Sequence, residues 1–245
     1  MSVDLVALPF AGSHMDPFLA LRRRAQECLP GLTSTTLTYP GHGKRISESA
    51  LTSIPAIAAD ALDMVLDRQP SGGPRPVVLL GYSMGCLVAY ELYFLLRASG
   101  IEVPAVLFMA STPPPKVKGI GLEIESDEEL LGHCVQYGLI SPADFPSPQL
   151  RALFLPALRR DIQAVDRYPG SVRGTRVLDP ETCVHVFTGR ADATVTFADH
   201  WRDITVGEPA TYEFDGGHFF LNDRRDEVTD AVLSVLSTCH EEIAA

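Results

Sequence analysis

The chain contains 245 residues, of which 46% are hydrophobic and 21% are charged. This length and composition favour a single α/β domain, residues 1–245, around one sizeable core. The formal net charge of −11 argues against nucleic acid as a partner, because the mean field of the protein would repel a phosphate backbone.

The cysteines and the N-terminal stretch indicate the compartment. The five cysteines are widely spaced and include no C-x-x-C pair, so neither a disulfide framework nor a zinc site is predicted, and we expect a reduced, cytoplasmic protein. The stretch MSVDLVALPFAG lacks a basic region and is interrupted by Asp4 and Pro9, which indicates a first strand instead of a signal peptide. No apolar run approaches the length of a membrane span, so no membrane association is predicted.

Short β-rich runs alternate with helical stretches along most of the chain. The predicted strands lie within residues 3–10, 34–40, 76–83, 105–111, 183–189 and 210–217. The predicted helices between them lie within residues 16–29, 53–69 and 84–100, the last with Gly100 as its C-cap. This order predicts a mostly parallel sheet, buried on both faces by helices, with active residues beyond the carboxyl ends of its strands.

The region of about residues 113–173 interrupts this alternation. It contains two helical pieces, at 126–138 and 147–168, and Ser126 and Glu129 have the spacing of a capping box at the start of the first. We interpret the region as a helical insertion that forms a lid over the strand ends. The alternative is an ordinary pair of crossover helices.

The stretch VVLLGYSMGCLVAYEL contains a candidate nucleophile. Ser83 lies between Gly81 and Gly85 in a G-x-S-x-G pattern, after a predicted buried strand and before a predicted helix, which is the sequence form of a nucleophile elbow. Side chains at the two glycines would collide where strand and helix approach, and the helix N-terminus favours developing negative charge. We predict that Ser83 is a nucleophile; the alternative is a Gly-Ser turn without chemistry.

A serine nucleophile needs a histidine base, which in this arrangement follows the serine in the chain. The downstream candidates are His133, His185, His200, His218 and His240. His218 is preferred, because it follows a predicted strand and a double glycine, where a loop at the strand end would present an imidazole. His133 falls in the proposed lid, His185 lies inside a strand pattern, and His240 lies in the acidic C-terminal tail.

The base needs an acid that orients it. Asp192 lies just past the end of the predicted strand 183–189, so Asp192 and His218 would leave neighbouring strand ends and could meet. Asp215 competes because it is near His218 in sequence, but it precedes the glycines and fits a turn better. Asp199 lies later, at what resembles a helix start. We predict Asp192 as the acid.

An oxyanion hole needs two hydrogen-bond donors. The first is predicted to be the backbone N–H of Met84, the residue after the nucleophile. The second comes from the loop LPFAGSH after the first strand, with Ala11 preferred and Phe10 as the alternative. His14 and His42 also lie in glycine-containing loops, and we favour loop or rim hydrogen bonding over catalysis for both.

Five segments carry a family resemblance through their order and spacing. They are LPFAG, YPGHGKR with the downstream LTSI, GYSMGCLVAYEL, FTGRAD with Trp201 in HWRDIT, and GGHFFL. Over nearly its whole length the chain resembles the type II thioesterases, stand-alone α/β-hydrolases that accompany modular polyketide synthases and non-ribosomal peptide synthetases.

The resemblance implies an α/β-hydrolase fold with a helical lid over an acyl chamber, and it makes Ser83 the nucleophile, His218 the base and Asp192 the orienting acid. The implied reaction is hydrolysis of acyl thioesters on acyl or peptidyl carrier proteins, for editing or product release. The phosphopantetheine arm arrives on the carrier protein, so no cofactor or metal of the chain's own is implied. We expect transient docking and a monomer.

The chain departs from the family pattern at two loops. Ser13, followed by His14, replaces the usual second glycine after AG, and His42 replaces the more frequent arginine of the PGRG-like segment. Both changes bear on substrate preference. Acyl preference is also expected to depend on lid packing around four residues, Phe145, Leu150, Phe154 and Leu158.

Two other functions share parts of this pattern. A carboxylesterase or lipase acting on small oxygen esters would use the same elbow and the same three side chains. A non-enzymatic binding protein of the same fold would use the pocket alone and would not need an intact set of catalytic residues.

Overall fold

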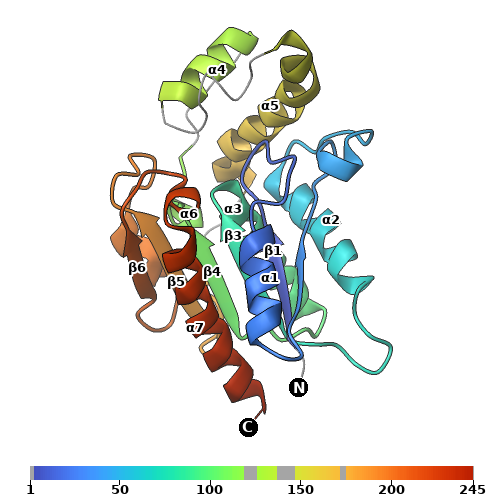
Figure 1. The fold of residues 1–245 in the computed structure, drawn as a ribbon, viewed down its shortest axis with the longest axis vertical. Helices are drawn as coiled ribbons and strands as arrows, with labels where there is room; N and C mark the ends of the chain where they lie inside the picture. The colour runs from blue at the N-terminus through green and yellow to red at the C-terminus, as the bar shows by residue number, and fades with distance from the viewer. Residues whose placement is uncertain (1–2, 119–125, 137–146, 172–174, 245) are drawn as a thin grey trace.

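One parallel sheet organises the molecule (Figure 1). The computed structural model describes residues 3–118, 126–136, 147–171 and 175–244. The strand order is β2-β1-β3-β4-β5-β6, and every neighbouring pair is parallel. The strands are β1 (Asp4–Leu8), β2 (Thr33–Thr36), β3 (Val77–Tyr82), β4 (Ala105–Met109), β5 (Cys183–Gly189) and β6 (Ala210–Phe214). The predicted α/β fold with a mostly parallel sheet is confirmed.

The inner and edge strands differ in burial. Every residue of β1, β3 and β4 is buried, as their near-continuous apolar sequences predict. The edge strands β2 and β6 are only partly buried, which differs from the prediction that the strands are covered on both faces. Each edge strand has a neighbour on one side only, and the sequence TSTT of β2 places small polar side chains there.

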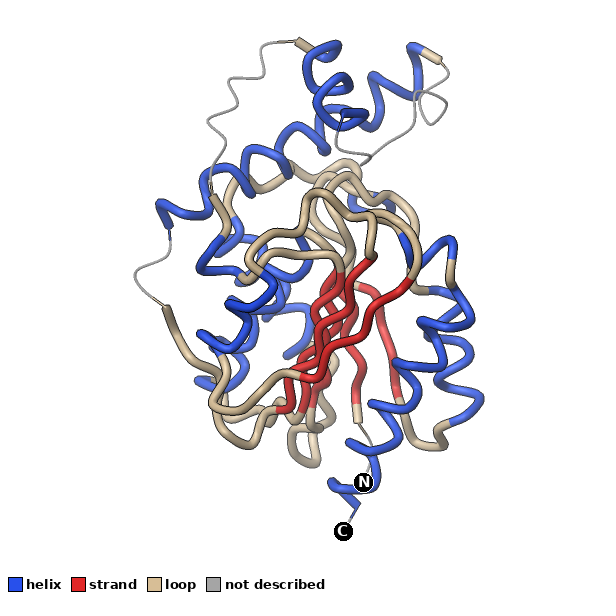
Figure 2. Tube along the Cα trace, turned by 90° about the vertical axis from the view of Figure 1, so that its left-hand side faces the viewer, coloured by secondary structure: helices blue, strands red, loops and turns tan. Residues whose placement is uncertain are grey.

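Helices cover both faces of the sheet, as Figure 2 shows from the side. The helices α2 (Ile54–Leu66) and α3 (Met84–Ala98) pack with Val6 and Leu8 of β1 in one core cluster. The helices α1 (Leu19–Cys28) and α7 (Arg225–Ala244) pack with Leu5 and Ala7 in the other. Alternate residues of one strand thus serve the two layers, because successive side chains point to opposite faces of a sheet.

The C-terminal helix α7 was not predicted from the sequence, which indicated only an acidic tail. Its buried apolar residues, Val228, Val232, Val235 and Leu236, recur at helical spacing and face the sheet beside α1. The acidic residues between them mask this pattern. The short helical segments in the described parts of the chain are η1 (Gly43–Arg45), η2 (Pro114–Lys116), η4 (Ala198–Ile204) and α6 (Phe220–Asp223).

Among the described residues between β4 and β5, two α-helices lie above the carboxyl edge of the sheet (Figures 1 and 2). In α4 (Asp127–Gln136) the predicted capping box is confirmed: the Ser126 N–H donates to Glu129 Oε2 at 3.0 Å, and the Glu129 N–H donates to Ser126 Oγ at 3.2 Å. The helix α5 (Pro148–Ser171) continues down beside α2, and its Ala164 and Tyr168 join the main core. No described helix is both long and apolar enough to cross a membrane.

The strand order determines where a crevice opens at the carboxyl edge of the sheet. The chain winds from β1 to β2 on one side and from β3 to β6 on the other, so its direction reverses between β1 and β3. Loops that leave two such strands diverge and open a crevice beyond their carboxyl ends, which is where open α/β sheets bind ligands. The loops that begin at Pro9 and Ser83 border this crevice.

Candidate active site

Ser83 occupies a sharp turn between β3 and α3. Its φ of 54° lies in the left-handed region, which costs energy for a residue with a side chain. A Cβ at Gly81 would lie 2.5 Å from the Gly85 carbonyl oxygen, and one at Gly85 would lie 2.0 Å from the Leu8 carbonyl oxygen. These approaches confirm the predicted steric need for both glycines, since strand, turn and helix can meet so closely only without side chains.

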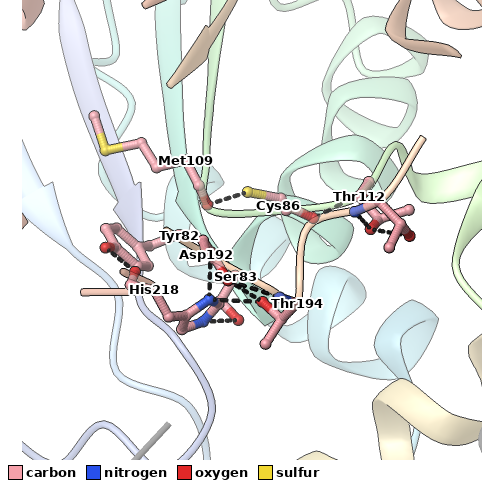
Figure 3. A network of polar contacts seen from close by, with 10 residues as sticks. Tyr82, Ser83, Cys86, Met109, Thr112, Asp192, Thr194 and His218 are labelled. Atoms are coloured by element: carbon pink, nitrogen blue, oxygen red, sulfur yellow. Dashed lines mark hydrogen bonds and ion pairs between the residues drawn. The ribbon is translucent and has the colours of Figure 1, made fainter. Parts of the chain in front are cut away.

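The His218 and Asp192 side chains converge on Ser83 from the loops after β6 and β5 (Figure 3). His218 Nε2 lies 3.0 Å from Ser83 Oγ, and His218 Nδ1 lies 2.8 Å from Asp192 Oδ2. A Cβ at Gly189 would lie 2.4 Å from the Gly217 carbonyl oxygen, so the ends of β5 and β6 are nearly in contact. The structure thus brings together the three side chains that the sequence singled out.

Asp192 is buried and fully engaged. Its side chain is 0% exposed, and Oδ1 accepts from the Thr194 hydroxyl at 2.6 Å and the Thr194 N–H at 2.9 Å. Burial works to raise the pKa of Asp192, but the hydrogen bond and charge of His218 and the Thr194 hydrogen bonds outweigh it and lower that pKa. Asp192 therefore stays ionised beside the imidazole, where it favours the Nδ1–H tautomer.

Two supporting residues were missed by the sequence reasoning. Thr194 follows Asp192 by two positions, a spacing at which side chains commonly hydrogen-bond local backbone, so a local signal existed. Tyr82 donates its hydroxyl to the His218 carbonyl at 2.5 Å, and its ring stacks on Phe219. The Tyr82 contact joins residues far apart in the chain, so it has no local sequence signal.

The other candidate acids lie away from the site. Asp215 is exposed and pairs with Arg190 at 2.7 Å and with Arg224 at 3.6 Å. Asp199 lies exposed within η4. The turn role that the sequence favoured for Asp215 agrees with this position.

The other downstream histidines lie on other elements. His185 lies on β5 with its ring beside Tyr212, and His200 pairs with Asp203 at 2.9 Å. His240 lies in α7, and His133 lies on α4 along the pocket wall. Only the loop after β6 places an imidazole against the serine hydroxyl among the residues that the structure describes.

His14 and His42 lie deeper than the rim position favoured from the sequence. His42 is 1% exposed, and its Nε2 lies 2.9 Å from Asp161 on α5. His14 Nδ1 accepts from the Gly43 N–H at 3.2 Å, and its ring packs on Phe154 with centroids 4.3 Å apart. Both are hydrogen bonders, as expected, but they act inside the contact between α5 and the early loops.

A pocket of about 390 Å³ opens over Ser83 and His218. Its apolar wall comes from α3, α5 and the segment after β4, and includes Met84, Leu87, Val117, Leu158, Ile162 and Val165. Of the four residues expected to tune acyl preference, Leu158 lines the pocket, whereas Phe154 packs on His14 and Leu150 lies near the start of α5. Phe145 lies outside the described residues.

The pocket also carries backbone and charged groups. Ala11 and Phe10 line it beside Ser83, and Met84 is the first residue of α3, where an N–H has no partner within the helix. Lys116 and Lys118 lie along its border, and they are two of the three lysines in the sequence. Within the described ranges, no group of three or more His, Cys, Asp or Glu side chains could hold a metal ion.

Comparisons with known proteins find thioesterases. The chain is 27% identical over 234 residues to the thioesterase TesA of Mycobacterium marinum, a match that covers 93% of this chain and 88% of TesA. It is also 27% identical to a probable cadicidin biosynthesis thioesterase of Streptomyces griseus, covering 96% of this chain but 63% of that relative's length.

Solved structures show the same fold. The type II thioesterase BorB from the borrelidin biosynthetic cluster has a TM-score of 0.78 at 28% identity, covering 98% of this chain and 93% of BorB. The thioesterase RedJ from the prodiginine pathway of Streptomyces coelicolor has a TM-score of 0.81 at 26% identity, covering 95% of this chain and 85% of RedJ. The model of the thioesterase domain matches residues 4–238, and the resemblance found in the sequence is confirmed: this α/β-hydrolase belongs to the thioesterase family.

Proposed function

We propose that this protein is a type II thioesterase that hydrolyses acyl thioesters on the phosphopantetheine arm of acyl or peptidyl carrier proteins, with Ser83, His218 and Asp192 as its catalytic residues. The observation that carries the proposal is the hydrogen-bonded chain from Asp192 through His218 to Ser83, which ends in a largely apolar pocket. The pocket suits an acyl chain, and the chain of hydrogen bonds suits an acyl transfer to serine.

In the acylation half-reaction, His218 Nε2 takes the Ser83 proton as Oγ attacks the thioester carbonyl carbon. The carbonyl oxygen becomes an oxyanion, which the Met84 N–H and the Ala11 N–H would stabilise. Asp192 holds the imidazole by its Nδ1–H and stabilises the imidazolium that forms. The C–S bond then breaks, the pantetheine sulfur leaves as a thiol with the proton from His218, and an acyl-Ser83 ester remains.

In the deacylation half-reaction, His218 accepts a proton from water, whose oxygen attacks the acyl-Ser83 carbonyl. The same two N–H groups receive the second oxyanion. Its collapse releases the carboxylic acid and returns the proton from His218 to Ser83 Oγ. A thiolate is a good leaving group, so the first half needs less help from a general acid than an amide would.

The biosynthetic setting rests on the relatives. Three of them are named for cadicidin, borrelidin and prodiginine biosynthesis, which supports a role in editing or product release on a polyketide or peptide assembly line. Carrier proteins are usually acidic, and this chain has a net charge of −11, so docking would be weak and transient. Lys118 and Lys116, the latter paired with Asp203 at 3.2 Å, lie at the pocket border and are the local positive groups that such a partner would meet.

We also propose that α4 and the first half of α5 act as a lid over the acyl pocket. The lid residue Leu158, together with Ile162 and Val165, forms the part of the wall contributed by α5. A cytoplasmic location is supported by the free thiols of Cys28, Cys86 and Cys134. The monomeric state stays a prediction.

Hydrolysis of a synthetic acyl-pantetheine thioester tests the nucleophile. Ser83→Ala should lower kcat by about 10³-fold or more, because no other group supplies the attacking oxygen. Turnover near the wild-type rate in this variant would remove Ser83 from the mechanism. The substrate class is tested by kcat/KM for the thioester against the matched oxygen ester; a preference for the oxygen ester would identify a carboxylesterase instead.

A further inference from the structure

We propose that Asp161 of α5 is a positioning residue for the oxyanion hole: its carboxylate holds the backbone turn that presents the Ala11 N–H. The helix that walls the acyl pocket would thereby also set the geometry of catalysis. This inference rests on the proposed function, because it assigns a role within the same acyl-transfer site.

The loop after β1 contains a turn of defined type. The Ser13 N–H donates to the Phe10 carbonyl at 3.3 Å, which closes a four-residue turn with Ala11 and Gly12 at its centre. Gly12 has a φ of 73°, whereas Ala11 is absent from the residues with positive φ, and this combination is that of a type II turn. A type II turn differs from a type I turn by a flip of its central peptide, here the peptide that joins Ala11 to Gly12.

Asp161 forms a hydrogen bond with the N–H of that central peptide. Its Oδ2 accepts the Gly12 N–H at 2.7 Å, and the same oxygen lies 2.9 Å from His42 Nε2. The Asp161 side chain is 2% exposed, so the contact is shielded from water and from competing donors. The hydrogen bond therefore selects one orientation of the Ala11–Gly12 peptide.

His42 completes the site for the carboxylate. Its Nδ1 lies 3.0 Å from the Pro40 carbonyl oxygen and its Nε2 faces Asp161, so both ring nitrogens meet acceptors. An imidazole can donate at both nitrogens only as the imidazolium, so this pair of acceptors favours protonation of His42 beside Asp161. A paired, hydrogen-bonded carboxylate can remain charged in this buried position.

Packing on both sides of the turn supports the same role. A Cβ at Gly12 would lie 2.9 Å from Leu158 Cδ1, so α5 packs directly on this loop. Leu158 precedes Asp161 by about one turn of the helix. Tyr39 donates its hydroxyl to the Pro9 carbonyl at 3.1 Å and fixes the start of the loop. At the far end of α5, the Tyr168 hydroxyl donates to Glu91 of α3 at 2.8 Å, which anchors the helix to the core.

Loss of the Asp161 carboxylate should weaken the oxyanion hole. Without Asp161, the Gly12 N–H loses its acceptor and the turn loses its hydrogen bond to α5, so the whole loop segment that carries the Ala11 N–H would shift relative to Ser83. Removal of one oxyanion donor costs about 10²- to 10³-fold in kcat in other serine hydrolases, so a displaced donor should cost about 10- to 100-fold. The substrate pocket would keep its other walls, so KM should stay within about threefold.

Three variants test the role with an acyl-pantetheine thioester. Asp161→Ala should show the loss in kcat with little change in KM. Asp161→Asn should recover most of that loss, because its amide oxygen can accept the Gly12 N–H. Asp161→Leu combined with His42→Phe replaces the buried ion pair with apolar volume and should lose kcat like Asp161→Ala, even if the single alanine variant does not fold.

Two ligands separate positioning from general damage. An alkyl boronic acid adds to Ser83 and places an oxygen in the oxyanion hole, so its affinity should fall about 10- to 100-fold in Asp161→Ala. A non-hydrolysable acyl-pantetheine thioether, which forms no oxyanion, should bind within about threefold of wild type. Arg160→Ala, on the exposed face of the same helix, is the matched control and should leave both affinities and kcat unchanged.

The proposal is overturned if kcat stays within about threefold of wild type in Asp161→Ala and in the double variant, if both ligands weaken equally, or if Asp161→Asn is no better than alanine. Absence of wild-type thioester hydrolysis would count against the proposed function instead. The boronic acid affinities would still test the positioning role, because they need no turnover.

Discussion

At the residue scale, Ser83 has a strained backbone and His218 is held by several hydrogen bonds. Ser83 keeps a φ of 54° because the hydrogen bond from its N–H to the Met109 carbonyl, at 2.8 Å, and the two flanking glycines over-determine the turn. His218 is held at four points: its ring contacts Ser83, Asp192 and the Thr194 hydroxyl, and its carbonyl accepts from the Tyr82 hydroxyl. In the proposed mechanism, this pre-organisation would allow proton transfer without rearrangement of the imidazole.

The choice of acid is tested by a matched pair of substitutions. Asp192→Asn should lower kcat by about 10³- to 10⁴-fold, because an amide would stabilise the wrong imidazole tautomer. Asp215→Asn should leave kcat near wild type, because Asp215 is exposed and its ion pairs with arginine contribute little. Steady-state hydrolysis of one thioester by both variants decides the matter; the reverse result would move the acid to Asp215.

At the scale of elements, α5 combines two roles that sequence reasoning treated as alternatives. Its residues Leu158, Ile162 and Val165 wall the pocket as expected of a lid, whereas Ala164 and Tyr168 pack in the main core like a crossover helix. Asp161 lies near the middle of α5, in sequence among the residues that wall the pocket. The pair formed by Asp161 and His42 therefore links the helix to the early loops at its midpoint.

The two buried histidines under α5 should give opposite pH dependences of stability. Burial alone would lower the pKa of His42, but the hydrogen bond and charge of Asp161 outweigh it and raise that pKa. Burial and the charge of His42 lower the pKa of His14, against smaller opposing effects of Asp161 and the Phe154 backbone. His42 therefore stabilises the fold below pH ~6.5, and this contribution is lost as pH rises through its elevated folded pKa.

For His14 the sign is reversed, because its lowered folded pKa favours protonation in the unfolded chain. Its contribution is complete above pH ~6.5 and is lost as pH falls through the depressed folded value. The free energy of unfolding in urea, followed by the fluorescence of buried Trp201, should show His42→Gln losing most relative to wild type at low pH. His14→Gln should lose most at high pH, and parallel profiles for the two variants would contradict this assignment.

At the scale of the whole molecule, charge should govern the encounter with a carrier protein. The net charge of −11 repels an acidic partner, and salt screens that repulsion. We expect KM for an acyl group on an acidic carrier protein to fall as NaCl rises from about 20 to 300 mM, over which the Debye length shortens several-fold. KM for the same acyl group on free pantetheine, which is uncharged, is the control and should not change.

The opposite trend would show that local attraction by Lys116 and Lys118 exceeds the mean repulsion. In that event the double substitution of both lysines by alanine should abolish the salt dependence, since Lys118 is exposed and Lys116 lies beside it along the pocket. Either trend is read from steady-state kinetics with one carrier-bound substrate.

The sequence by itself determined the features that depend on local pattern and chain order. Apolar runs with turn residues placed six strands, and the G-x-S-x-G pattern placed Ser83 at a strand–helix turn, because these signals lie within a few residues. Chain order, together with positions just past strands, was enough to select Asp192 and His218. Helix α7 was not predicted, because acidic residues interrupt its apolar pattern in the sequence. Its apolar residues are recognised as core only in the folded chain, where they pack against α1 and the sheet.

Tertiary structure alone decided the contacts between distant segments. Three of these contacts join residues more than a hundred positions apart: the hydrogen bond from Tyr82 to His218, the buried pair of His42 and Asp161, and the hydrogen bond from the Gly12 N–H to Asp161. No local propensity encodes such pairs, since each depends on how α5 and the β6 loop settle on the sheet edge. Local sequence therefore pointed to the three side chains that we propose as catalytic, and long-range packing specified how those side chains are held.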